Sequence, residues 1–302
     1  MNARKFARFA LLPVILLALT TIASADPYTD VIVYGDSLSD NGNLFAAIGY
    51  PPAPYWHGRF SNGPVTVEYL ASALYAPLLD FAYGGATTGV GNYIDHGTQT
   101  SFGGLGLPGM QPELAGSLST ITLIASSSLF VVWGGPNDFL TNGFSMATAD
   151  TAVSDLIGIV DELKLHGAQH ILVPGMPDLG LTPDYYGNLG ATQLSMYFNS
   201  LLLSELPKGV TYFNTFNFMH EVVGDPSAFG FTDVTDPCFN GVTVCANPGQ
   251  YLFWDGFHPT TAANVILAGQ FEKAVTPEPS TFLMLGSGVL GLAGILRRKI
   301  NL

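Results

Sequence analysis

The chain has 302 residues, a formal net charge of −13 at pH 7 and 48% hydrophobic residues. Six of its ten basic residues lie in the two end segments, so residues 26–279 hold four basic against 23 acidic residues, a net charge of −19. A surface of this sign repels phosphate backbones, which excludes nucleic acid as an expected partner.

The first 25 residues predict a secretory signal peptide. Basic residues near the start precede an apolar stretch, and small residues at 23–25 end it. This order is typical of a leader that is removed, with cleavage expected after Ala25. A retained membrane anchor is the alternative, and the short apolar stretch argues against it. The next 251 residues (26–276) have the length of one α/β domain.

Short apolar runs rich in β-branched residues predict buried strands at 30–36, 77–85, 128–135, 170–176 and 210–216. Segments with apolar residues at helical spacing predict three helices, within 148–167, from 190 to just before Pro207, and at 260–275. Strands that alternate with helices predict a parallel sheet covered by helices on both faces. In such sheets the loops at the carboxyl ends of the strands build the site.

The first predicted strand ends in a polar cluster, "YGDSLSDNGN" (34–43). A calcium loop would place Asp or Asn at its third position, where Leu38 stands, so no metal is expected here. A plain polar turn remains possible, because Asp, Ser, Asn and Gly are turn formers. The other interpretation is that one serine of this cluster is reactive.

A second polar cluster, "FWDGFHPTT" (253–261), precedes the last predicted helix and places Asp255 three residues before His258. A carboxylate fixes the tautomer of a histidine and stabilises its charged form. Alone, this pattern is also that of a solvated loop. Together with a serine at a strand end, it predicts a triad of Ser37, His258 and Asp255.

Such a triad needs hydrogen-bond donors for an oxyanion. Three candidates follow predicted strands: the backbone N–H of Ser37, the backbone N–H of Gly85 in "YGGAT", and the side-chain amide of Asn137 in "GGPND". Gly85 could instead belong to a simple bend, and Asn137 could cap a helix. The three occur together with the triad, and this combination favours the catalytic interpretation.

The blocks "YGDSLSDNGN", "YGGAT", "GGPND" and "DGFHPT" resemble, in order and spacing, those of the GDSL esterase/lipase family, the SGNH hydrolases. The resemblance covers about residues 29–274. Within this family, the chain is similar to the branch that contains secreted phospholipases, haemolysins, acyltransferases and outer-membrane esterases. The resemblance implies a flavodoxin-like α/β/α sandwich. It also implies a nucleophile, Ser37, a base, His258, an orienting carboxylate, Asp255, and oxyanion donors from Ser37, Gly85 and Asn137.

Cys238 and Cys245 are the only cysteines, and an exported chain meets an oxidising compartment, so a local disulfide is expected. Two free thiols are the alternative. No further zinc ligands stand nearby.

"GLGLPG" (104–109) has the spacing of a dinucleotide fingerprint but lacks the flanking strand and helix. No cofactor is therefore expected.

The C-terminal segment, residues 277–302, contains "PEP", an uncharged stretch (282–296) and three basic residues. This order resembles the PEP-CTERM sorting signal, which implies export from a Gram-negative-type bacterium and processing by an exosortase-type enzyme. The tail would first contact the inner membrane, as a marginal transmembrane span, and the protein would then reside in the periplasm, at the cell surface or in the extracellular matrix. A simple C-terminal anchor is the alternative.

These features predict an exported serine ester hydrolase that acts on acyl esters or lipids. The alternatives are an acyltransferase of the same scaffold, an exopolysaccharide deacetylase, and a non-catalytic surface or matrix protein that keeps the fold. The aromatic loop "PYWHGRF" (54–60) is expected to line the acyl or leaving-group pocket, which a substitution of Trp56 would test. Aromatic residues of the surface or core are the alternative.

Overall fold

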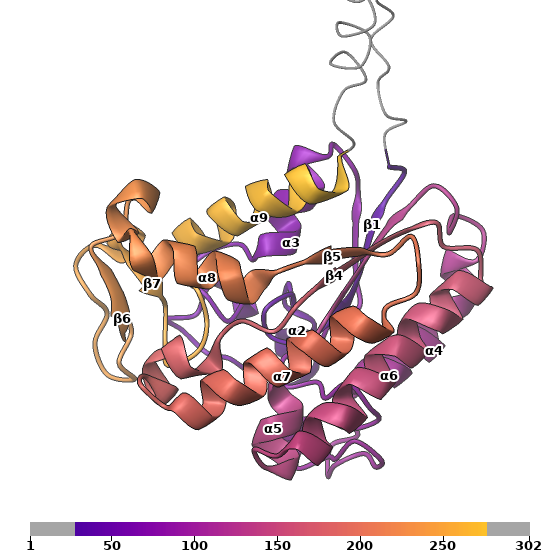
Figure 1. The fold of residues 1–302 in the computed structure, drawn as a ribbon, viewed down its shortest axis with the longest axis horizontal. Coiled ribbons are helices and arrows are strands. Elements are labelled where there is room, and N and C mark those ends of the chain that lie inside the picture. Colours follow the sequence, from indigo (N-terminus) through magenta and orange to yellow (C-terminus); the bar gives the residue numbers. More distant parts are fainter. Residues whose placement is uncertain (1–27, 277–302) are drawn as a thin grey trace, which may run out of the picture. The chain divides into compact units, whose positions relative to one another are not determined.

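The computed structural model of the chain describes residues 28–276 (Figure 1). The predicted leader (1–25) and the C-terminal tail (277–302) lie outside the described residues. None of the helices within 28–276 has both the length and the apolar character that crossing a membrane requires.

A parallel sheet forms the centre of the described part, with the strand order β2-β1-β3-β4-β5. Its strands are β1 (Val31–Gly35), β2 (Leu78–Asp80), β3 (Leu129–Trp133), β4 (His170–Pro174) and β5 (Thr211–Phe213). Each strand lies within one of the five predicted runs. This order is the flavodoxin-like one, with its topological switch point between β1 and β3.

Side chains of the strands alternate between two apolar cores, as the period of two in a strand requires. Ile32 and Tyr34 of β1 face one core, and Val31 and Val33 face the other. All four are fully buried. The central strands are therefore apolar on both sides, which is characteristic of a parallel sheet between two helical layers.

Helices cover both faces of the sheet (Figure 1). The layer on the side of Ile32 contains α4 (Met110–Ile121), α5 (Pro136–Asn142), α6 (Met146–Leu165) and α7 (Leu189–Glu205). The opposite layer contains α3 (Thr66–Ala73) and α9 (Thr261–Val275), with α8 (Thr215–Gly224) beside them. The predicted three-layer α/β/α sandwich is confirmed, and α6, α7 and α9 match the three predicted helices.

Two smaller features complete the region around the site. Helix α2 (Asn43–Ile48) starts directly after the polar cluster that follows β1. Strands β6 (Asp233–Pro237) and β7 (Tyr251–Phe253) pair with each other outside the main sheet. The predicted disulfide, Cys238–Cys245, is present in the connection between them.

Candidate active site

Ser37 is the second residue after β1, in a turn that the buried carboxylate of Asp40 holds. This carboxylate accepts hydrogen bonds from the backbone N–H groups of Gly42 (2.7 Å), Asn43 (2.6 Å), Leu44 (3.2 Å) and Gly84 (2.7 Å). Burial raises its pKa, and these four donors act in the opposite direction. One side chain thus joins the serine turn, the start of α2 and the loop after β2.

The structure brings Ser37, His258 and Asp255 together, although the serine lies more than 200 residues before the other two. His258 Nε2 lies 2.7 Å from Ser37 Oγ, and His258 Nδ1 lies 2.9 Å from both carboxylate oxygens of Asp255. Because an ionised carboxylate only accepts, Nδ1 carries the ring proton and Nε2 is free to accept the proton of Ser37. The three side chains form one continuous hydrogen-bonded chain.

The loop that carries His258 is closed by its own backbone. The N–H of Trp254 donates to the carbonyl of His258 (2.7 Å), and Asp255 Oδ1 accepts from the N–H groups of Phe257 (2.9 Å) and His258 (2.8 Å). A fourth residue, Tyr55, donates its hydroxyl to Asp255 Oδ2 (2.8 Å) from a loop 200 positions earlier. The carboxylate of Asp255 is therefore oriented by three donors besides the imidazole.

Electrostatics couple the histidine to its carboxylate. Burial alone would lower the pKa of His258, but the adjacent Asp255 charge outweighs it and the pKa lies above its usual value. Burial alone would raise the pKa of Asp255, and the charge and hydrogen bonds of His258 hold it below the usual range. Both shifts favour the charged pair, so the environment stabilises a protonated His258.

A third carboxylate, Asp36, lies directly before Ser37 and is almost fully buried. Burial raises its pKa to about 6, although the Leu38 N–H and the His258 charge act to lower it. Its Oδ2 accepts a long hydrogen bond (3.3 Å) from the amide of Asn137. Asp36 thus connects the serine turn to one of the predicted oxyanion donors.

The remaining predicted site residues, Gly85 and Asn137, line the same cavity as Ser37 and His258. Gly85 has a φ of 82°, and a Cβ there would collide with the side chains of Asn92 and Ile94, so only glycine fits. Asn137 is buried at the start of α5, where its amide also donates to the carbonyl of Ala86 (3.1 Å). The structure thus brings Gly85 and Asn137 to the cavity that Ser37 and His258 also line.

The cavity has a volume of about 550 Å³ and is mainly aromatic and aliphatic. Besides the residues above, its lining includes Tyr50, Phe60, Tyr93, Ile94, Leu140, Asp184, Tyr185 and Phe257. Trp56 of the aromatic loop (54–60) does not line this cavity, and its ring lies under the guanidinium of Arg59 (5.0 Å). From the same loop, Phe60 reaches the site and packs against the His258 ring (4.9 Å between centroids).

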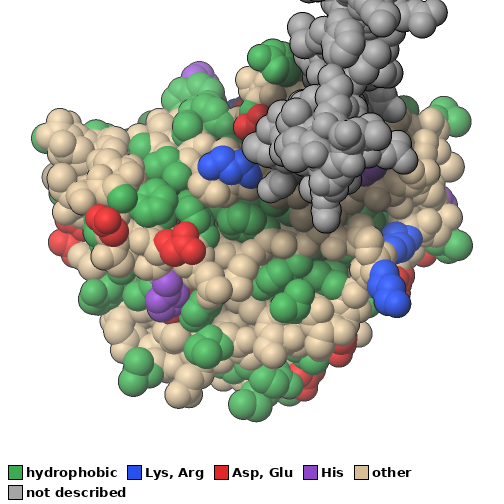
Figure 2. All heavy atoms as spheres, turned by 45° about the horizontal axis from the view of Figure 1, so that its top comes forward, with side chains coloured by type: hydrophobic (Ala, Val, Ile, Leu, Met, Phe, Trp, Pro, Cys, Tyr) green, Lys and Arg blue, Asp and Glu red, His purple; other side chains and the backbone are tan. Residues whose placement is uncertain are grey.

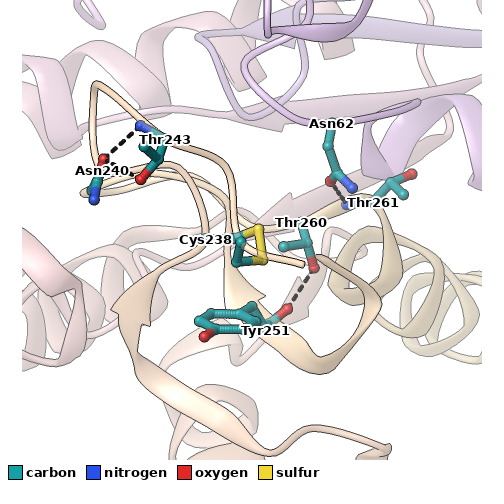
Figure 3. Close-up of a disulfide and its surroundings, with 8 residues drawn as sticks. Asn62, Cys238, Asn240, Thr243, Tyr251, Thr260 and Thr261 are labelled. Carbon is teal, nitrogen blue, oxygen red and sulfur yellow. Dashed lines mark hydrogen bonds between the residues drawn. A yellow bond between two sulfur atoms is a disulfide. The ribbon is translucent and has the colours of Figure 1, made fainter. Parts of the chain in front are cut away.

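The disulfide at Cys238 is drawn in Figure 3 together with Thr260, which follows His258 by two residues. Backbone N–H groups of Cys238 and Phe239 donate to the carbonyls of Phe253 (3.1 Å) and Trp254 (2.6 Å), directly before Asp255. Phe239 stacks on Trp254 (5.7 Å) and contacts Tyr55 (5.7 Å). The disulfide loop (residues 238–245) therefore supports both Asp255 and its donor Tyr55.

On the other side of His258, the chain is anchored before α9 begins. Thr260 Oγ1 donates to the carbonyl of Tyr251 (2.7 Å), and the Thr261 N–H donates to Asn62 (2.8 Å), as Figure 3 shows. Within residues 28–276 no group of His, Cys, Asp and Glu side chains is arranged to hold a metal ion.

Sequence reasoning missed Tyr55 as a partner of Asp255 and Asp184 as part of the cavity. Both contact the histidine loop across long sequence separations, and neither belongs to a motif. The only sequence signal was the aromatic character of the loop around Tyr55, which was assigned to substrate binding instead.

Comparisons with known proteins agree with this architecture. The chain is 31% identical over 244 residues to a phosphatidylcholine-sterol acyltransferase of Aeromonas hydrophila, covering 76% of this chain and 71% of the relative. It is 26% identical over 333 residues to a GDSL esterase/lipase of Arabidopsis thaliana, covering 86% and 92%. The fold is similar to a crystal structure assigned as a GDSL-like lipase from Parabacteroides merdae, with a TM-score of 0.50, 14% identity, and coverage of 82% and 96%.

Two family profiles match the chain. The PEP-CTERM protein-sorting motif matches residues 275–299, and this motif implies export in Gram-negative bacteria and exosortase processing. The profile of the GDSL-like lipase/acylhydrolase matches residues 31–271, nearly the whole of the described part. The chain therefore belongs to the GDSL-like lipase/acylhydrolase family.

Proposed function

We propose that this exported protein is a serine ester hydrolase that cleaves carboxylic esters through an acyl-enzyme. The observation that carries the proposal is the hydrogen-bonded chain from Ser37 through His258 to Asp255, which opens into an aromatic cavity. Ser37 is the nucleophile, His258 the general acid and base, and Asp255 the carboxylate that orients and stabilises His258.

In the first half of the reaction, Ser37 Oγ attacks the ester carbonyl carbon while His258 Nε2 takes its proton. The charge of Asp255, which raises the pKa of His258, stabilises the imidazolium that forms. Collapse of the tetrahedral intermediate breaks the bond to the alcohol, and His258 returns the proton to the leaving oxygen. In the second half a water molecule attacks the acyl-enzyme with the same assistance, which releases the acid and restores Ser37.

The oxyanion is stabilised by the N–H groups of Ser37 and Gly85 and by the amide of Asn137. The contact of Asn137 with Asp36 is long (3.3 Å), so a full negative charge on the substrate can displace it. Each donor is expected to contribute ~2.7–4 kcal/mol to the transition state. Asn137→Ala should therefore lower kcat by roughly 10²–10³ with a smaller change in KM.

Acyl transfer is a second candidate, because the relative from Aeromonas hydrophila is named an acyltransferase. Transfer needs only that an alcohol replaces water at the acyl-enzyme. Adding a soluble alcohol to the assay separates the two functions: a new ester product indicates transfer, and free acid alone indicates hydrolysis.

The proposed organisation is a leader cleaved after Ala25, a catalytic domain (26–276) and a sorting tail (277–302) that contacts the inner membrane until it is processed. Deleting residues 277–302 should change the fraction of the cell in which the protein is found. An unchanged location after this deletion would contradict the role of the tail.

The activity is tested with chromogenic esters of increasing acyl length, hydrolysed by wild type and Ser37→Ala. Wild type should hydrolyse at least one ester, and a fluorophosphonate should label Ser37, as identified by mass spectrometry. Ser39→Ala is the matched control, because Ser39 is buried two residues away and does not line the cavity. Activity that persists in Ser37→Ala contradicts the mechanism, and a wild type inactive on every ester contradicts the enzymatic proposal.

A further inference from the structure

The end of the cavity beside His258 is where the alcohol part of an ester lies during catalysis. His258 returns its proton to the leaving oxygen, so that oxygen must come within hydrogen-bond reach of Nε2. The carbonyl oxygen points the other way, toward Gly85 and Asn137. Residues around the histidine loop therefore contact the alcohol, and their chemistry selects it.

Aromatic rings surround this end of the cavity. Phe60 packs against the His258 ring on one side (4.9 Å between centroids). Phe257 lies on another side (6.4 Å), and Tyr185 continues the wall from Phe257 (5.5 Å). Tyr50 extends the wall beyond Phe60 (5.9 Å). All four rings belong to the cavity lining.

The carboxylate of the exposed Asp184 lines the cavity next to these rings, and the buried Asp36 beside Ser37 is the other lining carboxylate. The backbone N–H of Asp184 donates to the carbonyl of Gly256 (3.0 Å), and its carboxylate packs so closely on Gly256 that a Cβ there would collide with it. Glycine at 256 thus allows Asp184 to approach the histidine loop. Within the described residues this carboxylate has no side-chain hydrogen bond and no ion pair.

The cavity lining contains no Lys or Arg, and its only basic side chain, His258, is already paired with Asp255, although its charge acts to lower the pKa of Asp184. Arg59, which belongs to the aromatic loop (54–60), forms an ion pair with Glu68 (2.7 Å). Lys and Arg side chains are also sparse on the face drawn in Figure 2. Partial burial and the nearby Asp255 raise the pKa of Asp184. A cationic ligand would relieve this repulsion, whereas an anionic one would add to it.

We propose that Phe60, Phe257, Tyr185 and Asp184 form a subsite for a quaternary ammonium group, so that the preferred substrates are esters whose alcohol carries a trimethylammonium, as in choline esters. Aromatic faces with a carboxylate are the arrangement that binds such cations. The inference rests on the proposed hydrolase function, because it uses His258 to place the alcohol. It adds the class of alcohol, which the triad alone leaves open.

The test compares two esters that differ only in charge: acetylcholine and 3,3-dimethylbutyl acetate, in which a carbon replaces the quaternary nitrogen. For the purified exported protein, kcat/KM for acetylcholine should exceed that for the neutral ester by about tenfold or more, since each cation–aromatic contact contributes roughly two- to thirtyfold. Asp184→Asn should lower this ratio severalfold. Asp161→Asn, the same charge change at an exposed position on α6, should leave the ratio as in wild type.

A second measurement separates two sources of the cation. Phosphatidylcholine vesicles carry the ammonium on the lipid headgroup, and phosphatidylglycerol vesicles lack it. The rate of fatty acid release measures the hydrolysis of each lipid. The subsite is supported if the wild type prefers the substrate with the ammonium group, in the pair of small esters or in the pair of lipids, and Asp184→Asn reduces this preference. The pair that shows the preference identifies whether the cation comes from a small ester or from a lipid headgroup. Equal kcat/KM for both members of both pairs overturns the subsite but not the hydrolase, whereas no Ser37-dependent hydrolysis of any of them overturns the hydrolase itself.

Discussion

The turn that carries Ser37 and the loop that carries His258 meet at one site but are stabilised by different parts of the molecule. Ser37 follows β1, which pairs with β2 and β3 and is buried on both faces. Its turn is held by the buried Asp40 through four backbone donors. His258 lies outside the main sheet, in a loop supported by Tyr55 and by the disulfide loop 238–245.

This difference suggests that the position of the nucleophile depends on the core, whereas the position of the base depends on peripheral contacts. Changes at the turn should reduce stability and activity together. Changes around the histidine loop should reduce activity with a smaller loss of stability. Each prediction below tests one side of this contrast.

The largest expected effect is that of Asp255→Asn, which removes the charge that orients His258. We expect kcat to fall by roughly 10³–10⁴. The melting temperature should fall less than in a substitution of Asp40, because Asp255 accepts two backbone N–H groups and Asp40 accepts four. In wild type, kcat/KM should rise with pH as His258 loses its proton, at a pKa above the usual 6.5. Without the carboxylate the pKa of His258 falls, so the acid limb of the pH profile, the range over which kcat/KM rises, moves to lower pH. A limb that stays in place would show that Asp255 does not control His258.

Asp40→Asn should instead act on stability. An amide can replace only part of the acceptor capacity of the carboxylate, which leaves buried backbone donors unpaired at ~1–3 kcal/mol each. We expect the free energy of unfolding, measured with urea, to fall by about 3 kcal/mol and esterase activity to fall with it. Asp225→Asn is the control, because Asp225 also accepts a backbone N–H but is exposed, and it should change the free energy by less than ~1 kcal/mol. Equal losses in both variants would contradict the role of the buried turn.

This contrast also explains which features could be predicted from the sequence. The five strands of the central sheet fall within short apolar runs, so this sheet and the α/β architecture followed directly, whereas β6 and β7 were not predicted. Asp255 and His258 are three residues apart, and a motif of that length is visible in the chain. Tyr55 reaches Asp255 across 200 positions, and such contacts depend on how loops pack. The helices α2 and α5 have six and seven residues, too few for a helical period to be recognised.

The third prediction concerns the disulfide loop. Replacing Cys238 and Cys245 by serine opens a loop closed across a sequence separation of 7, which should lower the free energy of unfolding by about 2 kcal/mol. We expect kcat to fall severalfold because Phe239 and Trp254 lose support next to Asp255. The fluorophosphonate should still label Ser37 completely, though more slowly. A variant with wild-type kcat would show that the disulfide loop does not support the base.

The smallest expected effect on stability is that of Tyr55→Phe, which removes only the hydroxyl that donates to Asp255. We expect kcat to fall by about tenfold, ~1.4 kcal/mol, with KM nearly unchanged. Without this donor the charge of Asp255 acts more strongly on His258 and raises its pKa further. The acid limb of the pH profile should therefore move to higher pH, opposite to the shift in Asp255→Asn.

Tyr69→Phe is the matched control for this substitution. Tyr69 also has a hydrogen-bonded hydroxyl, 2.8 Å from Thr261 Oγ1 near the start of α9, but it contacts neither Asp255 nor His258. It should lose similar stability and keep both kcat and the pH profile. If Tyr55→Phe and Tyr69→Phe behave alike, Tyr55 only fills space. If their acid limbs differ in the stated direction, Tyr55 is a positioning residue that moderates the charge of Asp255, and the base is tuned from outside the core.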